Sequence, residues 1–381
     1  MMGISFWTFI SLVGITAIHH SYAGFYNIAH MTNNIPSIDW AIQKGANAIE
    51  IDLQFKGDGT PYRFFHSSTC DCSCMCGAGG CHIAYPNSVC MQLEKTSTYP
   101  CDANTDSVKL LQHAAKQQGM ALIIIDSKLT DGGKQMSKDT LQNAGRKVIT
   151  LIEENLYGQG YKGSVIIGAT GFANKEYIKE ISMTNSVYRD RIHFTIDFEE
   201  MKATKEQLDF SWNKNIVYNI GHSACSPSNK AYFGISKLSA INQAKGVFGM
   251  TYTWSVDLYK TMNYYSNYFN GIITNYPGIL TGLLKLKGIP LAKPEDRIAP
   301  ATSSKVATSH DSYLCECTYY SGGCKVTKAA PKGLACQCTY PFLWTCKGWV
   351  VQCTDQAASQ CQNPGTLKQD CLEGRGDCGG Y

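Results

Sequence analysis

The chain has 381 residues, a formal net charge of +4 and 18 cysteines. So slight a charge, with no dense basic run, excludes strong electrostatic attraction to nucleic acid, and we expect no nucleic-acid partner. No stretch is apolar for long enough to cross a bilayer, so we expect no transmembrane segment.

Residues 1–23 have the pattern of a secretory signal peptide. An apolar stretch covers residues 6–18, and Ser21-Tyr22-Ala23 has the small-x-small form of a cleavage site. We therefore predict a secreted, extracellular protein whose mature chain begins near Gly24.

The cysteines form two groups with even numbers. Eight lie between Cys70 and Cys225, and ten lie between Cys315 and Cys378. Export to an oxidising compartment favours disulfides in both groups. Closely spaced cysteines also suit tetrahedral zinc sites, which is the alternative.

Between residues 24 and 290, short β-branched apolar runs alternate with segments at helical spacing, the pattern of repeated βα units. Eight runs are predicted strands: 25–30, 47–53, 121–126, 164–169, 192–197, 216–220, 247–254 and 271–275. Six segments are predicted helices: 35–44, 105–118, 140–156, 174–184, 205–210 and 237–245. Eight units in about 250 residues predict an α/β fold, a closed (β/α)₈ TIM barrel. A doubly wound open sheet is the alternative, but no glycine fingerprint follows the first strand.

Three other segments complete the predicted domain organisation around a barrel domain at 24–290. Residues 57–102 are too long for an ordinary connection and hold seven cysteines, so we expect a disulfide-stapled loop over one face. Residues 291–312 are rich in Pro, Ala, Ser and Thr without periodicity, which predicts a linker. Residues 313–381 carry ten cysteines and few aliphatic residues, which predicts a small disulfide-rich domain. The segments "CECTY" and "CQCTY" in it suggest two related β-hairpins.

Three acids occur where predicted strands end, the positions at which barrels carry catalytic groups. Glu50 and Asp52 are two residues apart, so they point to one face of their strand, and Asp126 ends the next strand. Like charges on a buried face need a cation between them, and carboxylate oxygens suit Mg²⁺. The alternative is an ion pair between these acids and a core Lys or Arg.

Two histidines are candidate proton carriers near these acids. His30 ends the first predicted strand, and His66 ends the strand-like "PYRFFH" just before the cysteine cluster. Two imidazoles on either side of a phosphate can act as base or nucleophile and as acid. Lys128 could neutralise charge on the phosphoryl oxygens. The alternatives are hydrogen-bonded structural histidines and a surface lysine.

Aromatic residues at the end of the seventh predicted strand are candidate headgroup contacts. Tyr252 and Trp254, with Asp257 beyond them, could surround a quaternary ammonium by cation–π attraction. Aromatic residues in a strand are more often core residues, which is the alternative.

These motifs resemble those of a known family. In order, "AHMTNN", "GANAIEIDLQF", "FFHSSTCDCSCMC", "IIIDSKLTD", "YTWSVD" and "GIITNYP" resemble segments of the sphingomyelinase D / phospholipase D toxins of sicariid spider venoms. That family belongs to the glycerophosphodiester phosphodiesterase superfamily of secreted barrels. The resemblance covers residues 24–285, and spacing agrees as well as residue type.

The resemblance implies a role for each candidate residue. His30 and His66 would be the catalytic pair, and Glu50, Asp52 and Asp126 the Mg²⁺ ligands. The substrate site would be lined by Lys128, Tyr252, Trp254, Asp257 and Asn275. It also implies two disulfides, Cys70–Cys76 and Cys72–Cys225. The family releases the headgroup of sphingomyelin or lysophospholipids by attack of a neighbouring substrate hydroxyl on phosphorus, which leaves a cyclic phosphate.

The chain departs from the family pattern at several places. Ser127 replaces an apolar residue between Asp126 and Lys128, the family's barrel-plugging C-terminal tail is not recognisable, and the family lacks a ten-cysteine domain. Ordinary glycerophosphodiesterases carry His-Arg where this chain has His30-Met31, which favours the toxin-like branch.

The leading hypothesis is therefore a secreted, monomeric, Mg²⁺-dependent phospholipase D-like enzyme acting on phospholipid at a membrane surface. It would release choline or ethanolamine from sphingomyelin, ceramide phosphoethanolamine or lysophospholipids. One alternative is hydrolysis of soluble glycerophosphodiesters. Another is a non-catalytic lipid-binding barrel in which the cysteine-rich domain carries recognition. The ligand of that domain is not indicated by its sequence, and it could equally be a stabilising appendage.

Overall fold

The computed structural model describes residues 24–66, 105–131, 133–198, 200–209, 213–221 and 233–306, and the backbone of four short strands between residues 317 and 353. The predicted signal peptide and all eight cysteines of the barrel region lie outside these residues. None of the described helices is long and apolar enough to cross a membrane.

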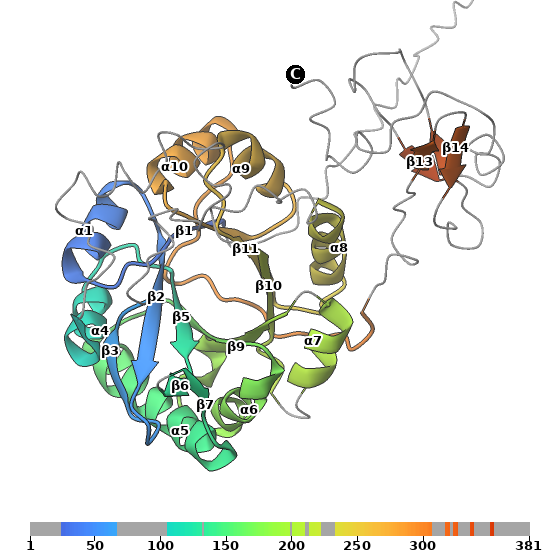
Figure 1. Ribbon diagram of the computed structural model, residues 1–381. Helices are drawn as coiled ribbons and strands as arrows, with labels where there is room; N and C mark the ends of the chain where they lie inside the picture. Colours follow the sequence, from blue (N-terminus) through green and yellow to red (C-terminus); the bar gives the residue numbers. More distant parts are fainter. Residues whose placement is uncertain are drawn as a thin grey trace, which may run out of the picture.

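Eight parallel strands form a nearly closed barrel in the order β10-β11-β12-β1-β2-β5-β8-β9. Their bounds are β1 Tyr26–Ala29, β2 Ala48–Phe55, β5 Leu122–Lys128, β8 Ser164–Thr170, β9 Ile192–Asp197, β10 Val217–Gly221, β11 Met250–Trp254 and β12 Gly271–Thr274. The ring closes where Phe194 of β9 bridges Ile216, just before β10. The predicted TIM-barrel architecture is therefore confirmed (Figure 1).

Helices surround the barrel (Figure 1). They are α1 Ile35–Gln43, α4 Ser107–Ala115, α5 Lys138–Asn155, α6 Lys175–Met183, α7 Met201–Leu208, α8 Phe233–Ala244, α9 Tyr259–Tyr265 and α10 Pro277–Leu286. The sequence patterns missed α9 and α10. Helix α9 is short and rich in tyrosine, which has only modest helix propensity. Helix α10 starts at Pro277, and a proline at the first helical position is a start signal that does not depend on apolar periodicity.

Four short strands accompany the barrel: β3 Pro61–Phe64, β4 Thr105–Asp106, β6 Thr130–Asp131 and β7 Lys134–Gln135. Strand β3 folds back antiparallel on β2 and pairs Phe64 with Leu53. It corresponds to the strand-like run predicted before His66. The pairing fixes the chain that leads into His66 next to the carboxyl end of β2.

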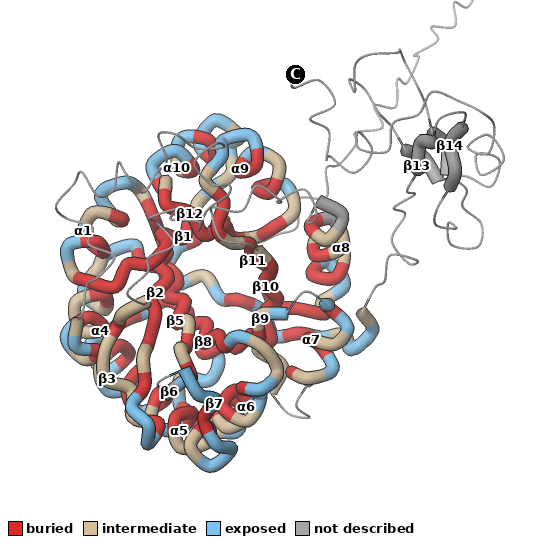
Figure 2. Tube along the Cα trace, in the orientation of Figure 1, coloured by how far each residue is buried: buried red, intermediate tan, exposed pale blue. Residues whose placement is uncertain are grey.

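Alternation along each barrel strand separates two apolar layers. On β2, Ile49, Ile51 and Leu53 are buried in the layer against the helices. Ala48 belongs to a second buried cluster inside the barrel. Because side chains alternate along a strand, Glu50 and Asp52 also point into the barrel. The barrel strands are mostly buried, whereas the helices expose their outer faces (Figure 2).

The beginning of the predicted linker 291–312 packs against the barrel. Ala292 and Ile298 are buried in the interior cluster. The amide of Ala301 donates to the Lys214 carbonyl at 2.7 Å. A side chain at Gly249, beside the start of β11, would lie 1.9 Å from the Ala299 carbonyl oxygen. The described part of this segment, up to residue 306, thus covers the amino-terminal end of the barrel, where apolar side chains would otherwise face solvent.

The cysteine-rich segment contains two antiparallel strand pairs. Strand β13 (Cys317–Tyr320) pairs with β14 (Gly323–Val326), and β15 (Cys336–Cys338) pairs with β16 (Val351–Cys353). The two repeated "CxCTY" segments contribute to β13 and β15.

Candidate active site

The carboxyl ends of the barrel strands surround a cavity of about 280 Å³. Eight of the ten predicted catalytic, metal and substrate residues line it: His30, Glu50, Asp52, His66, Asp126, Lys128, Tyr252 and Trp254. The other two, Asp257 and Asn275, lie behind His30 instead. The structure thus brings most of the predicted site residues together at one end of the barrel.

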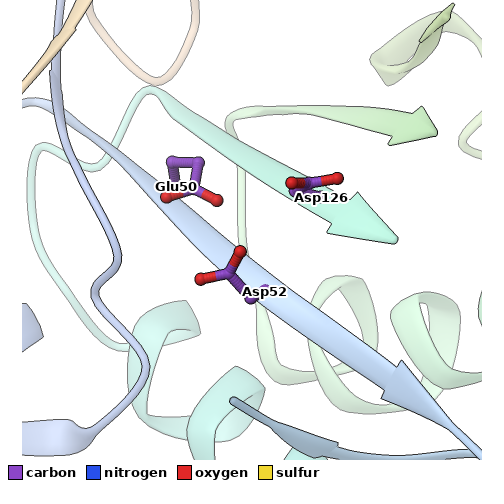
Figure 3. A group of neighbouring side chains, drawn as sticks. All are labelled: Glu50, Asp52 and Asp126. Carbon is purple, nitrogen blue, oxygen red and sulfur yellow. The ribbon is translucent and has the colours of Figure 1, made fainter. Parts of the chain in front are cut away.

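The three acids form a compact cluster. Asp52 of β2 pairs in register with Asp126 of β5, and Glu50 lies one inward position below Asp52. One carboxylate oxygen from each residue lies within 4.8 Å of the other two. Figure 3 shows the three side chains on one face of the two neighbouring strands. Oxygen donors at this spacing are suited to binding a metal ion.

Lys128 lies against two of these acids. Its Nζ atom is 2.9 Å from Oδ1 of Asp52 and 2.5 Å from Oδ2 of Asp126. Burial disfavours the charged ammonium, but the carboxylates outweigh it and hold the pKa of Lys128 well above its ordinary value. Three carboxylates and one ammonium leave a formal charge of −2, which one divalent cation would balance. The donor set and its charge therefore fit a divalent metal.

Glu50 and Asp52 are both buried, but their pKa values are shifted in opposite directions. Burial, followed by repulsion from Asp52 and Asp126, raises the pKa of Glu50 well above its ordinary value. Burial acts in the same direction on Asp52, but attraction to Lys128 and His66 and a hydrogen bond from Asn33 lower its pKa overall. A bound cation would offset the cost of ionising Glu50.

The loop after β1 holds both β2 acids in place. The amide of Met31 donates to Oε2 of Glu50 at 2.7 Å. Asn33 donates to Oδ2 of Asp52 at 2.6 Å and accepts from the Asp52 amide at 2.7 Å. Met31 has a φ of 53°, the one left-handed non-glycine residue in the described part of the chain. This uncommon conformation turns the Met31 amide toward Glu50.

A chain of hydrogen bonds fixes the ring of His30. Its Nδ1 lies 3.0 Å from Oδ1 of Asn275, and Nδ2 of Asn275 donates to Oδ2 of Asp257 at 2.9 Å. A carboxylate accepts only, so the amide must turn its oxygen toward His30. Nδ1 therefore carries the proton, and the lone pair of the neutral ring lies on Nε2.

His66 reaches the cavity from the β3 hairpin. The amide of Phe65 donates to the Asp52 carbonyl at 2.8 Å, which places the adjacent His66 near the Asp52 carboxylate. The attraction between His66 and Asp52 is one cause of the lowered Asp52 pKa. An imidazolium at His66 would therefore have a counter-ion.

The wall opposite the acids contains residues that the sequence patterns did not single out. Thr195 and Asp197 of β9 and Asn219 of β10 line the cavity beside Trp254. Asp197 also contributes to the raised pKa of the buried Tyr252, after burial itself. The available signal was their position: Asp197 ends a predicted strand, and Asn219 interrupts an apolar run.

The departure at Ser127 has a structural explanation. Its side chain points away from the cavity, and its Oγ lies 2.8 Å from the hydroxyl oxygen of Tyr177 on α6. Both residues are buried. A hydroxyl partner on the helix thus replaces apolar packing behind Asp126 and Lys128.

The predicted disulfide cysteines Cys70, Cys72, Cys76 and Cys225 lie outside the described residues, so both predicted bridges stay predictions.

The chain is similar to known proteins along most of its length. A dermonecrotic toxin from Loxosceles intermedia, LiSicTox-betaID1, is 26% identical over 271 residues, covering 68% of this chain and 81% of the toxin. A dermonecrotic toxin from Sicarius terrosus, StSicTox-betaIB1i, is 24% identical over 278 residues, covering 68% and 90%.

Among solved structures, a Parabacteroides distasonis glycerophosphodiester phosphodiesterase has 14% sequence identity and a TM-score of 0.45. The match covers 70% of this chain and all of that one. The barrel assignment rests on the strand order of the chain itself.

The profile of the dermonecrotic toxin SPH family matches residues 21–296, which is most of the chain and includes every residue of the described cavity. The chain therefore belongs to the dermonecrotic toxin SPH family.

Proposed function

We propose that the protein is a secreted, Mg²⁺-dependent phospholipase D-like enzyme. It releases choline or ethanolamine from sphingomyelin, ceramide phosphoethanolamine or lysophospholipids and leaves a cyclic phosphate. The observation that carries this proposal is the joint position of three carboxylates and two imidazoles on one cavity. Secretion is supported by the signal-peptide pattern and the cysteine content.

Glu50, Asp52 and Asp126 would hold the metal. Bound there, Mg²⁺ would polarise a phosphoryl oxygen and offset negative charge on the phosphate. Lys128 adds a positive charge at the same end of the cavity, where it can also attract phosphoryl oxygens.

The two histidines would divide the proton transfers. Nε2 of His30 accepts the proton of the attacking substrate hydroxyl, whose oxygen forms a new bond to phosphorus. The bond from phosphorus to the headgroup oxygen breaks, and that oxygen takes a proton from the imidazolium of His66. The Asp257–Asn275 pair supports the first transfer because it keeps the His30 proton on Nδ1.

The headgroup would lie on the opposite wall. The indole of Trp254 offers a π-face to a cationic headgroup, and Asp197 offers a carboxylate. Tyr252, buried below them, closes the floor of this side.

Turnover of defined lipids tests the proposal. The purified protein is incubated with sphingomyelin, lysophosphatidylcholine or ceramide phosphoethanolamine, and products are followed by ³¹P NMR. We expect a cyclic phosphate signal that requires Mg²⁺ and is abolished by His30→Asn. Release of glycerol phosphate from soluble glycerophosphodiesters would favour the hydrolase alternative, and no reaction with any substrate would favour the lipid-binding alternative.

We also propose that residues 313–381 form a disulfide-rich recognition domain that directs the barrel to a surface. Ten cysteines in so short a segment support the disulfides. Deleting these residues should weaken binding to cells and leave turnover of detergent-dispersed lipid unchanged. Unchanged cell binding with a lower Tm would instead identify a stabilising appendage.

A further inference from the structure

Three neighbouring strands of the cavity wall are joined by side-chain hydrogen bonds. The indole Nε1 of Trp254 on β11 donates to Oδ1 of Asn219 on β10 at 2.8 Å. Nδ2 of Asn219 donates to Oγ1 of Thr195 on β9 at 2.9 Å. Asn219 and Thr195 are buried, with 2% and 1% of their surfaces exposed. Water therefore has little access to compete for these bonds.

The direction of these hydrogen bonds follows from which groups can donate and which can accept. An indole nitrogen can only donate, so Asn219 must turn its amide oxygen toward Trp254. The amide nitrogen then faces β9, where Thr195 supplies the acceptor. The indole thus requires an acceptor at residue 219, and the Asn219 amide meets this requirement while its nitrogen donates to Thr195.

Gly221 holds the backbone of Trp254 from the same strand, β10. The two residues are register partners. A side chain at Gly221 would lie 1.6 Å from the Trp254 carbonyl oxygen, so the approach requires glycine. Strand β10 thus fixes Trp254 twice, at its backbone through Gly221 and at its indole through Asn219. The ring is held in one orientation across the cavity.

We propose that Asn219 is a positioning residue that acts through Trp254 to set the preference between trimethylammonium and primary ammonium headgroups. This inference rests on the proposed function, because it assigns the Trp254 wall to the headgroup.

The physical reason is the difference between the two cations. A trimethylammonium group has no N–H donor and depends on the face of an aromatic ring. A primary ammonium can donate hydrogen bonds, and the Asp197 carboxylate of the same cavity offers it an acceptor. A loosely held indole therefore weakens binding of the trimethylammonium headgroup more than binding of the primary ammonium headgroup.

The first test measures a ratio of affinities. Calorimetry with phosphocholine and phosphoethanolamine gives the preference of the wild-type protein without any need for turnover. Asn219→Leu should lower the phosphocholine to phosphoethanolamine affinity ratio by roughly tenfold. Thr195→Val removes only the hydrogen bond between Thr195 and Asn219, so it should lower the affinity ratio by less. This variant also tests the inference if Asn219→Leu fails to fold.

A matched rescue separates positioning from general damage. Asn219→Thr keeps a neutral oxygen that can accept from the indole N–H and adds no charge to the cavity, so the ratio should return toward the wild-type value. An Asn219→Leu ratio equal to that of the wild type would overturn the inference.

A double variant tests whether Asn219 acts through the indole. In a Trp254→Phe background the indole N–H is absent, so Asn219→Leu should change the ratio no further. An equal effect with and without the indole would contradict the proposal. If the wild type cleaves no lipid but these ratios change as expected, the proposed reaction fails while the positioning role stands. If lipids are cleaved and the ratios stay constant, the positioning role alone fails.

Discussion

Nδ1 of His30 lies 3.0 Å from Oδ1 of Asn275, whose amide nitrogen donates to Asp257. Asp257 thus determines, through one amide, which nitrogen of His30 carries a proton. Neither Asp257 nor Asn275 lines the cavity, so both act on the reaction through His30.

Asp257→Asn should reverse this arrangement. Oδ1 of Asp257 accepts from the backbone N–H of Asn275 and from the hydroxyl of Thr274. An NH₂ group cannot accept these bonds, so in the variant it must take the place of Oδ2. It would then face the NH₂ of Asn275 and turn that side chain over. The proton of His30 would move to Nε2, and kcat should fall by about 10²- to 10⁴-fold with little change in KM.

Nitrogen NMR of the His30 ring checks this directly, since the two neutral tautomers have distinct spectra. Thr274→Val is the matched control, because it removes one hydrogen bond to the same carboxylate and leaves the amide orientation alone. A variant with the wild-type tautomer and a low kcat would contradict the relay.

Mg²⁺ affinity should depend on the three clustered acids and not on every acid of the cavity. Glu50→Gln and Asp126→Asn should each lose most Mg²⁺ binding in calorimetry. Mg²⁺ at 100 times its Kd should stabilise the wild type by about 2.7 kcal/mol and these variants by far less. Asp197→Asn is the control, because Asp197 lines the cavity outside the cluster. Equal losses in all three variants would argue for a general effect of cavity charge.

Lys128→Met should separate metal binding from folding. Lys128 neutralises Asp52 and Asp126, so the metal-free variant should be destabilised by about 3 kcal/mol. Removing a positive charge beside the acids should at the same time strengthen Mg²⁺ binding. Urea unfolding in EDTA and calorimetry with Mg²⁺ measure the two effects, and weaker Mg²⁺ binding would show that Lys128 organises the acids more than it repels the metal.

Acid should destabilise the barrel through His193. This inward-facing residue of β9 is fully buried, and neither ring nitrogen has a partner among the described residues. Burial, with a smaller effect of Arg297, lowers its pKa from 6.5 to about 3. Between these values the unfolded chain binds a proton that the folded chain does not. Stability should therefore fall as pH drops below about 6.5, by up to ~1.4 kcal/mol per pH unit.

His193→Phe removes the titrating group and keeps a ring of similar size. Unfolding in urea between pH 4 and 7 should show a shallower loss of stability in the variant. Parallel curves for wild type and His193→Phe would show that other groups cause the acid sensitivity.

The strand ends could be predicted because their signal is local. Glu50 and Asp52 interrupt an apolar run at a spacing of two, and that spacing alone places them on one face. Contacts between distant segments leave no such signal. Asn33 is an ordinary loop residue in sequence, and Asn275, which ends a predicted strand, is predicted at the substrate site and not behind His30. The roles of both depend on amide orientations set by partners on distant segments.

The burial of the segment after residue 290 could not be predicted from its sequence. Its composition is that of a linker, yet Ile298 is buried at the barrel end. A single apolar side chain has no periodic neighbours, so the sequence does not indicate that it is buried. Its burial depends on the open end of the barrel, against which it packs.

The pair formed by Ser127 and Tyr177 should be coupled in stability. Ser127→Ala leaves the buried Tyr177 hydroxyl without its hydrogen-bond partner, and Tyr177→Phe does the same to the Ser127 hydroxyl. Each change should lower the free energy of unfolding by about 1–2 kcal/mol. In the double variant no polar group is stranded, so its cost should be close to that of one single change, with a coupling of roughly 1 kcal/mol. Urea unfolding of the four proteins measures this cycle.

Because the Ser127 side chain points away from the cavity, Ser127→Ala should keep most of the wild-type kcat. Strictly additive costs would show that the two hydroxyls do not depend on each other, and a large loss of kcat would show that this contact positions Asp126 and Lys128.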